Sequence, residues 1–186
     1  MKVLSLMGSP RKEGNSAFAS SRVIEFFKKE GYETEEFYIS NMKIAGCIAC
    51  EKCRKEGRCV IKDDFPGLLD KIQESDIFVI TAPIYFGRVP GTVKNFIDRC
   101  YSLFDDSYKS KIKPGKRCLF ITVSHAPAEA FSEEVNYLEK WFVDFMKFKS
   151  AEKIAIGKCA APGDLEVRKE DLNKIDKACK KLAGIE

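Results

Sequence analysis

Short apolar runs alternate with amphipathic segments along the whole chain. The runs predict buried strands at residues 2–7, 32–39, 76–81, 117–123 and 153–156. Helical spacing of apolar positions predicts helices at residues 15–30, 63–74, 91–103, 131–147 and 165–183. The segment 46–62 follows neither period and is expected to be irregular. Because each strand is followed by a crossover segment, the pattern predicts an α/β fold: a five-stranded parallel sheet with helices on both faces.

Composition places the chain among folded, globular proteins. Its 186 residues are enough for one domain, so residues 1–186 are expected to form a single domain. The 14 Phe and 6 Tyr exclude a disordered chain. The net charge of +4 gives no reason to expect nucleic acid as a partner. No apolar run approaches the ~18 residues that cross a membrane, and the first residues lack the features of a signal peptide, so a cytoplasmic protein without a membrane partner is expected.

The loop after the first predicted strand has the chemistry of an anion site. It reads Gly-Ser-Pro-Arg-Lys-Glu-Gly-Asn-Ser at residues 8–16 and leads into a helix. Ser9, Asn15 and Ser16 offer side-chain donors, Arg11 offers a planar fork suited to phosphate, and the helix N-terminus offers free N–H groups. It contains neither a Walker motif nor G-x-G-x-x-G. The alternative is an ordinary loop in which Asn15 or Ser16 caps the helix.

A second motif follows the third predicted strand. It reads Thr-Ala-Pro-Ile-Tyr-Phe-Gly at residues 81–87, and then Val-Pro-Gly-Thr-Val-Lys-Asn-Phe-Ile-Asp-Arg at residues 89–99. Together with residues 8–16, this motif resembles the flavodoxin-like NAD(P)H-dependent FMN reductase superfamily over most of residues 1–105. The resemblance implies a doubly wound sheet of order 2-1-3-4-5, in which the loops after the first and third strands flank one ligand crevice.

The same resemblance implies that these two loops bind FMN. The implied cofactor-binding residues are Ser9, Arg11, Lys12, Gly14, Asn15 and Ser16 in the first loop, and Pro83, Ile84, Tyr85, Phe86 and Gly87 in the second. Tyr85 and Phe86 have an alternative interpretation as core aromatic residues. Lys94, Asp98 and Arg99 are expected on a helix surface or at a subunit contact rather than at the flavin.

The chain has eight cysteines and only one histidine, and four of the cysteines are clustered. Cys47, Cys50, Cys53 and Cys59 have the spacing C-x2-C-x2-C-x5-C within the segment 46–62. Compact thiolates of this kind suit an iron–sulfur cluster or zinc. Redox-active or structural thiols without metal are the remaining alternative. Zinc is less favoured because its sites usually use well-separated C-x2-C pairs.

Combined with the flavin loops, the cysteine spacing resembles the iron–sulfur flavoproteins, a branch of the same superfamily. That resemblance implies one [4Fe-4S] cluster on Cys47, Cys50, Cys53 and Cys59, in a cysteine-rich loop inserted into the flavodoxin-like domain. It also implies a homodimer or homotetramer.

The other reactive side chains have less specific patterns. Cys100, Cys118, Cys159 and Cys179 lie in apolar segments and are expected to be buried small hydrophobic residues. His125 follows the fourth strand, either near the flavin or in a solvated loop. The basic run at Lys109, Lys111, Lys113, Lys116 and Arg117 is expected to be a solvated face, or else a docking site for an acidic ferredoxin or a nucleotide phosphate.

These features predict an FMN-dependent redox enzyme whose cofactors carry the chemistry, so no catalytic side chain is assigned. Electrons would pass between a donor such as NAD(P)H or ferredoxin and a small acceptor: a quinone, oxygen or peroxide, or a metal ion. One alternative is an NAD(P)H-dependent FMN or quinone reductase without a cluster. Another is a non-enzymatic protein, either an electron carrier or a binding domain stabilised by a structural zinc ion.

Overall fold

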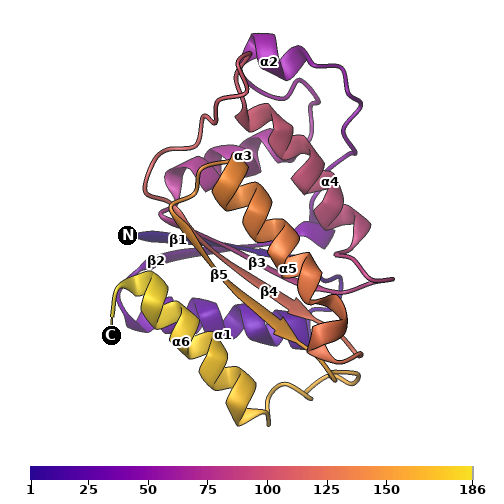
Figure 1. Cartoon of the computed structure of the whole chain (residues 1–186), viewed down its shortest axis with the longest axis vertical. Coiled ribbons are helices and arrows are strands. Elements are labelled where there is room, and N and C mark those ends of the chain that lie inside the picture. The colour runs from indigo at the N-terminus through magenta and orange to yellow at the C-terminus, as the bar shows by residue number, and fades with distance from the viewer. Residues whose placement is uncertain (186) are drawn as a thin grey trace.

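The computed structural model describes residues 1–185 and contains the predicted parallel sheet (Figure 1). Its strands are β1 (Lys2–Met7), β2 (Glu33–Tyr38), β3 (Ile77–Pro83), β4 (Arg117–Val123) and β5 (Ser150–Ile156). The order is β2-β1-β3-β4-β5 and every pairing is parallel, which confirms the predicted flavodoxin-like order 2-1-3-4-5.

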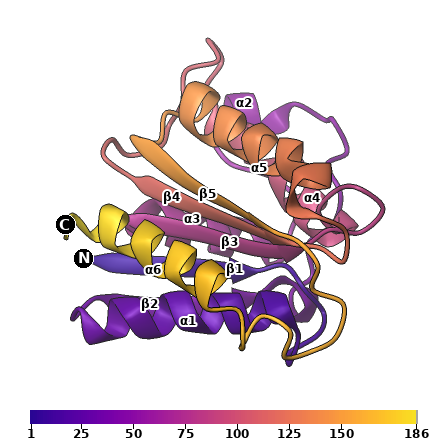
Figure 2. The same cartoon turned by 60° about the horizontal axis from the view of Figure 1, so that its bottom comes forward.

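Helices cover both faces of the sheet. Figures 1 and 2 show α1 (Asn15–Lys29) and α6 (Lys169–Ala183) on one face, and α3 (Phe65–Glu74), α4 (Gly91–Arg99) and α5 (Ser132–Glu139) on the other. The short helix α2 (Lys52–Glu56) lies away from the sheet, beyond α4, at the top of Figure 1. Among residues 1–185, no helix combines the length and apolarity needed to span a membrane.

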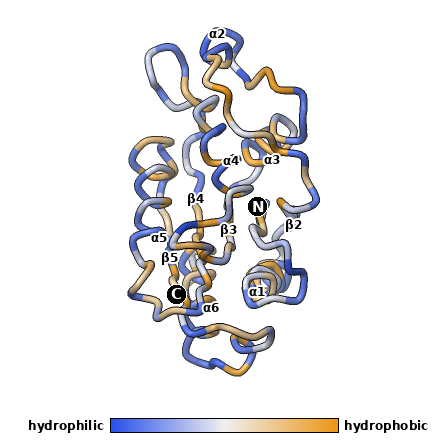
Figure 3. The backbone as a smooth tube through the Cα atoms, turned by 90° about the vertical axis from the view of Figure 1, so that its right-hand side faces the viewer, coloured by the Kyte–Doolittle hydropathy of each residue, from blue (hydrophilic) through white to orange (hydrophobic). Residues whose placement is uncertain are grey.

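Alternation along the strands creates two hydrophobic cores, one on each side of the sheet. In β3, Ile77 and Val79 pack into the core under α1 and α6, while Phe78 and Ile80 pack into the core under α3, α4 and α5. Because successive strand side chains point to opposite faces, a strand with consecutive apolar residues fills both cores. In Figure 3 the central strands are correspondingly hydrophobic.

Several predicted boundaries were wrong. The segment 46–62 is not wholly irregular, since it contains α2. The predicted helix at 131–147 divides into a 3-10 turn (Ala128–Phe131), α5 and a π-helical segment (Lys140–Phe145). The last helix begins at Lys169 rather than at residue 165. Just before this helix, the Asp164 carboxylate accepts the N–H groups of Ala160 and Ala161. These bonds form a turn that competes with helix formation.

The loop after β1 crosses closely over the end of β3. The N–H of Gly8 donates to the carbonyl of Thr81 at 2.7 Å. A Cβ atom at Gly8 would lie 2.6 Å from Cγ2 of Val93 and 2.9 Å from Cβ of Ala82. The two motif-bearing segments therefore meet through a contact that only glycine allows.

We expect Gly8→Ala to destabilise the fold by about 1–3 kcal/mol, because the added methyl group overpacks this crossing. Urea unfolding followed by circular dichroism measures the change. Gly67→Ala is the control, since nothing lies within 4 Å of the Cβ position there. An equal effect of the two substitutions would contradict the steric explanation.

Candidate functional site

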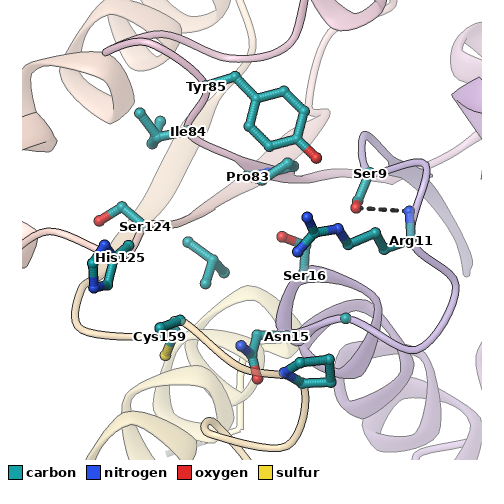
Figure 4. Close-up of a pocket in the computed structure, with 14 residues that line it drawn as sticks. Ser9, Arg11, Asn15, Ser16, Pro83, Ile84, Tyr85, Ser124, His125 and Cys159 are labelled. Carbon is teal, nitrogen blue, oxygen red and sulfur yellow. Dashed lines mark hydrogen bonds between the residues drawn. The ribbon is translucent and has the colours of Figure 1, made fainter.

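A cavity of about 160 Å³ lies at the carboxyl ends of the strands (Figure 4). Segments from the loops after β1, β3, β4 and β5 form its walls. The lining residues are Ser9, Arg11, Gly14, Asn15, Ser16, Pro83, Ile84, Tyr85, Val123, Ser124, His125, Cys159, Ala160 and Pro162. The structure thus brings together the two motifs that are separated by some seventy residues in the sequence, as the predicted sheet order requires.

The N-terminus of α1 is one wall of this cavity. Its N-cap residue is Gly14, and no side chain caps the helix. The N–H groups of the first turn are therefore left for a ligand, and the helix dipole makes this end positive. Figure 4 shows the Arg11 guanidinium beside Ser16 at this end of the helix. This is the arrangement that binds a phosphate group.

Two of the expected donors have partners within the protein. The Oγ atom of Ser9 accepts the Arg11 N–H at 3.1 Å, which leaves its hydroxyl proton free. The Asn15 side chain donates to the carbonyl of Ala161 at 2.8 Å and accepts the N–H of Leu165 at 3.0 Å. Asn15 therefore ties the loop before α6 to the start of α1, and its backbone N–H belongs to the uncapped first turn of α1.

The opposite wall ends in a tight turn at residues 85–88. The N–H of Tyr85 donates to the carbonyl of Arg88 at 2.8 Å, and the N–H of Arg88 donates back at 3.2 Å. Phe86 and Gly87 have φ angles of 51° and 86°, which are typical of a type I′ turn. Among the described residues, the N–H groups of Phe86 and Gly87 have no hydrogen-bond acceptor.

Phe86 and Tyr85 are not core residues. The Phe86 side chain is fully exposed and Tyr85 is 44% exposed, so the alternative that they fill the core was wrong. The buried carboxylate of Glu134, in α5, holds this turn in place. It accepts the Val89 N–H at 3.2 Å and pairs with the Arg88 guanidinium at 3.2 Å.

A second cavity, of about 380 Å³, contains the clustered cysteines. Cys47, Cys50, Cys53 and Cys59 all line it, together with residues of the α4 C-terminus and the segment that follows α4. Ala49 and Glu51 have left-handed φ angles of 52° and 56°, so the backbone curls between the first three cysteines. Among residues 1–185, no three His, Cys, Asp or Glu side chains converge on a single metal-ion position.

Hydrogen bonds close the two ends of the cysteine loop against each other. The Asp63 carboxylate accepts the N–H of Ala45 at 2.9 Å, and the Asp64 carboxylate accepts the N–H of Lys43 at 2.6 Å. The N–H of Asp64 donates back to the carbonyl of Lys43 at 3.0 Å. The chain therefore leaves and rejoins the fold at one point, and the four cysteines lie on the loop between.

Comparisons with known proteins identify the family of this chain. The NADPH-dependent FMN reductase family matches residues 1–158. The chain belongs to this family. An iron–sulfur flavoprotein of Archaeoglobus fulgidus is 30% identical to the chain over 183 residues, which are 98% of this chain and 79% of that protein. An iron–sulfur flavoprotein of Methanosarcina thermophila is 36% identical over 115 residues, which are 62% of this chain. The resemblance to the iron–sulfur flavoprotein branch is confirmed.

The matched segment spans only 60% of the length of the Methanosarcina protein. Among solved structures, an NAD(P)H:quinone oxidoreductase from Methanothermobacter marburgensis superposes with a TM-score of 0.75. That superposition covers 98% of this chain and 97% of the other at 15% identity, so it shows a shared fold.

The residues that line the cavity at the strand ends differ in a few positions from those expected to bind the cofactor. Lys12, Phe86 and Gly87 lie outside the lining in the described part of the chain. Cys159 is buried as expected, but it also lines the cavity, and its Sγ accepts a hydrogen bond from Arg168 at 3.3 Å. Its position directly after the fifth strand was the signal available in the sequence. His125 is both exposed and part of the lining.

Arg99 is the largest departure from expectation. It was expected on a helix surface with Lys94 and Asp98, which do form an exposed ion pair. Arg99 is instead only 2% exposed and pairs with Asp63. Burial disfavours its charge, but hydrogen bonds to Asp63 and Cys59 outweigh burial and raise the pKa of Arg99. Burial likewise acts to raise the pKa of Asp63, but the Arg99 hydrogen bond and backbone N–H groups hold it below its usual value.

The loop between α4 and β4 contacts α2 and the residue that follows it. The Arg54 guanidinium lies 4.3 Å from the Tyr108 ring centroid and donates to the Tyr108 hydroxyl at 3.1 Å. Lys111 donates to the carbonyl of Gly57 at 2.6 Å. Lys116 is buried against the carbonyl of Ser75, so the basic run is not the continuous solvated face that was expected.

We expect thiol alkylation of metal-free protein to distinguish the cysteine groups. Cys47 and Cys50 are exposed, whereas burial raises the pKa of Cys118 and raises that of Cys179 to about 12. Because the thiolate is the reacting form, iodoacetamide at neutral pH should modify Cys47 and Cys50 first. Cys118 and Cys179 should react only after unfolding. Peptide mapping by mass spectrometry measures the order, and early modification of Cys179 would contradict the structure.

Proposed function

We propose that this protein is an FMN-dependent oxidoreductase of the iron–sulfur flavoprotein type. The observation that carries the proposal is the pairing of two cavities in one flavin-reductase fold. One is built around a positive, uncapped helix N-terminus, and the other is lined by four cysteines.

The first cavity fits FMN. Its phosphate would lie at the start of α1, bound by Ser9, Arg11, Gly14, Ser16 and the backbone of Asn15. The flavin ring would lie against Pro83, Ile84 and Tyr85, with the N–H groups of Phe86 and Gly87 available to its polar edge. Lys12 is exposed within the loop that follows β1 and contributes positive charge near the phosphate. Ser124 and His125 complete the wall on the β4 side.

The second cavity fits a [4Fe-4S] cluster on Cys47, Cys50, Cys53 and Cys59. Zinc needs all of its ligands within about 2.3 Å of one ion. A four-iron cube instead takes one thiolate on each iron, so its ligands surround a volume, as the cysteines on the walls of this cavity do. The left-handed residues between the first three cysteines let a short loop follow the surface of a compact group.

When bound, FMN exchanges two electrons as a hydride or one at a time, and an iron–sulfur cube exchanges single electrons. The chain's own residues bind and orient both groups: Arg11 and the α1 N-terminus at one, the clamped cysteine loop at the other. We propose NAD(P)H or ferredoxin as the electron donor. Quinones, oxygen or peroxide, and metal ions are the proposed acceptors.

The exposed rings of Tyr85 and Phe86 beside the cavity support a homodimer or homotetramer in which a second copy covers them.

An NAD(P)H-dependent FMN or quinone reductase without a cluster is the second candidate. The exposure of Cys47 and Cys50 and the likeness to the Methanothermobacter quinone oxidoreductase support it. In that case the cysteine loop has a structural role or forms a disulfide on oxidation.

Absorption of anaerobically purified protein separates the two candidates. We expect flavin bands together with a broad brown absorption that dithionite bleaches. Cys53→Ala should remove the brown absorption and the iron but leave the FMN, because the two cavities have separate linings. Cys179→Ala, at a buried position of α6 in the core, is the matched control and should keep both. Flavin bands alone in protein reconstituted with iron and sulfide would favour the cluster-free reductase, and colourless protein that binds no FMN would exclude both.

We also expect Arg11→Ala to weaken FMN binding by about 1.5–3 kcal/mol, which is the range for hydrogen bonds to charged groups. Fluorescence quenching of FMN titrated into apoprotein measures the affinity. Lys12→Ala removes the same charge from a position outside the cavity lining and should have a smaller effect. Equal effects would mean that only the net charge of the loop matters. A loss confined to Lys12→Ala would overturn the assignment of Arg11.

A further inference from the structure

Arg99 directs a buried positive charge at one corner of the cysteine cavity. Its Nη2 donates to Sγ of Cys59 at 3.2 Å, and its Nη1 donates to the carbonyl of Ala45 at 3.3 Å. The same nitrogen pairs with the Asp63 carboxylate, and the guanidinium carbon lies 4.3 Å from the centroid of the Phe65 ring. One side chain therefore contacts both ends of the cysteine loop and one of its cysteines.

We propose that Arg99 is a positioning residue that fixes the Cys59 corner of the cluster site and raises the reduction potential of the bound cluster. This inference rests on the proposed [4Fe-4S] site. It concerns the residue that orients and polarises a ligand, not the ligands themselves.

The Asp63–Arg99 pair fixes the geometry at the base of the cysteine loop. One oxygen of Asp63 accepts both the Ala45 N–H and the Arg99 guanidinium, and the other accepts the Phe65 N–H at 3.2 Å. Arg99 in turn reaches Cys59 and the Ala45 carbonyl. The planar fork of arginine allows these contacts together, whereas the single ammonium of lysine does not reproduce them. Cys59 is thereby held at a fixed position relative to the base of the loop.

The Arg99–Asp63 pair is buried. The Arg99 side chain is 1% exposed and that of Asp63 is 10% exposed, so solvent screens the pair weakly. Among the described residues, Nε of Arg99 is buried without an acceptor, so one N–H group of the guanidinium has no partner. An N–H donor on a ligating sulfur and a nearby positive charge both stabilise the more negative, reduced state of a cluster. Hydrogen bonds to cluster sulfurs are one of the protein's means of setting the potential.

The test is a redox titration of holoprotein, followed by electron paramagnetic resonance of the reduced cluster, with iron per chain measured on each sample. Arg99→Met should lower the cluster potential. At a fixed applied potential we expect the reduced-to-oxidised ratio to fall about tenfold, which is about 59 mV for a one-electron couple. Asp63→Asn removes the compensating negative charge and should shift the potential in the opposite direction. Arg99→Lys keeps the charge and should lie between wild type and Arg99→Met.

Arg58→Met is the matched control. It removes the same charge from the residue next to Cys59, but this guanidinium is 62% exposed and pairs with Asp70, so little change in potential is expected. The flavin potential, read in the same titration, should stay at its wild-type value in every variant.

The outcomes separate this inference from the proposed function. If wild-type protein reconstituted with iron and sulfide holds no iron, the proposed cluster site fails. If wild type holds iron but Arg99→Met has an unchanged potential, or Arg99→Met and Asp63→Asn shift it in the same direction, only the role of Arg99 is overturned. Should Arg99→Met fail to fold, Asp63→Asn and Arg99→Lys still give the predicted opposite and intermediate shifts. Loss of iron from all three would show that the pair only shapes the site, and would overturn the proposed effect on the reduction potential.

Discussion

Parallel pairing of all five strands is the constraint on which both sites depend. In such a sheet every strand ends at the same edge, so the loops after β1, β3, β4 and β5 converge there. The close crossing of Gly8 over Thr81 brings the first two loops into contact. Helix α1 begins directly after the first of them, so its free N–H groups face the cavity formed by the others. The candidate FMN site is therefore a consequence of strand order combined with an uncapped helix.

Helix α4 joins this edge to the cysteine cavity. Its first residue follows the turn that Glu134 holds, and its last residue is Arg99. With 9 residues at 1.5 Å per residue, this helix is roughly 13 Å long. Its apolar positions, Val93, Phe96 and Ile97, are buried in the core, so the helix is fixed in the fold. A rigid element thus positions the loops at both of its ends.

The chemistry-bearing motifs could be recognised in the sequence because each is short and local. Of the eleven residues expected to bind the cofactor, all but Lys12, Phe86 and Gly87 line the first cavity, and the four spaced cysteines line the second. What local patterns could not show was which donors already have partners in the fold. The Asn15 side chain is bonded to residues about 150 positions away, and Cys159 reaches the cavity from the far end of the chain. Such partners are set by contacts between distant segments, and a local pattern carries no information about them.

The sequence by itself determined the five strands, the sheet order implied by its family resemblance and the identity of the clustered thiols. It did so because alternation, helical spacing and ligand spacing are properties of neighbouring residues. Only the tertiary structure decided that Arg99 is buried against Asp63 and Cys59 while Lys94 and Asp98 remain exposed on the same helix. A charged residue at the end of an amphipathic helix is normally solvated. Here the cysteine loop folds back over that end and supplies a carboxylate, a carbonyl and a thiol to satisfy the charge.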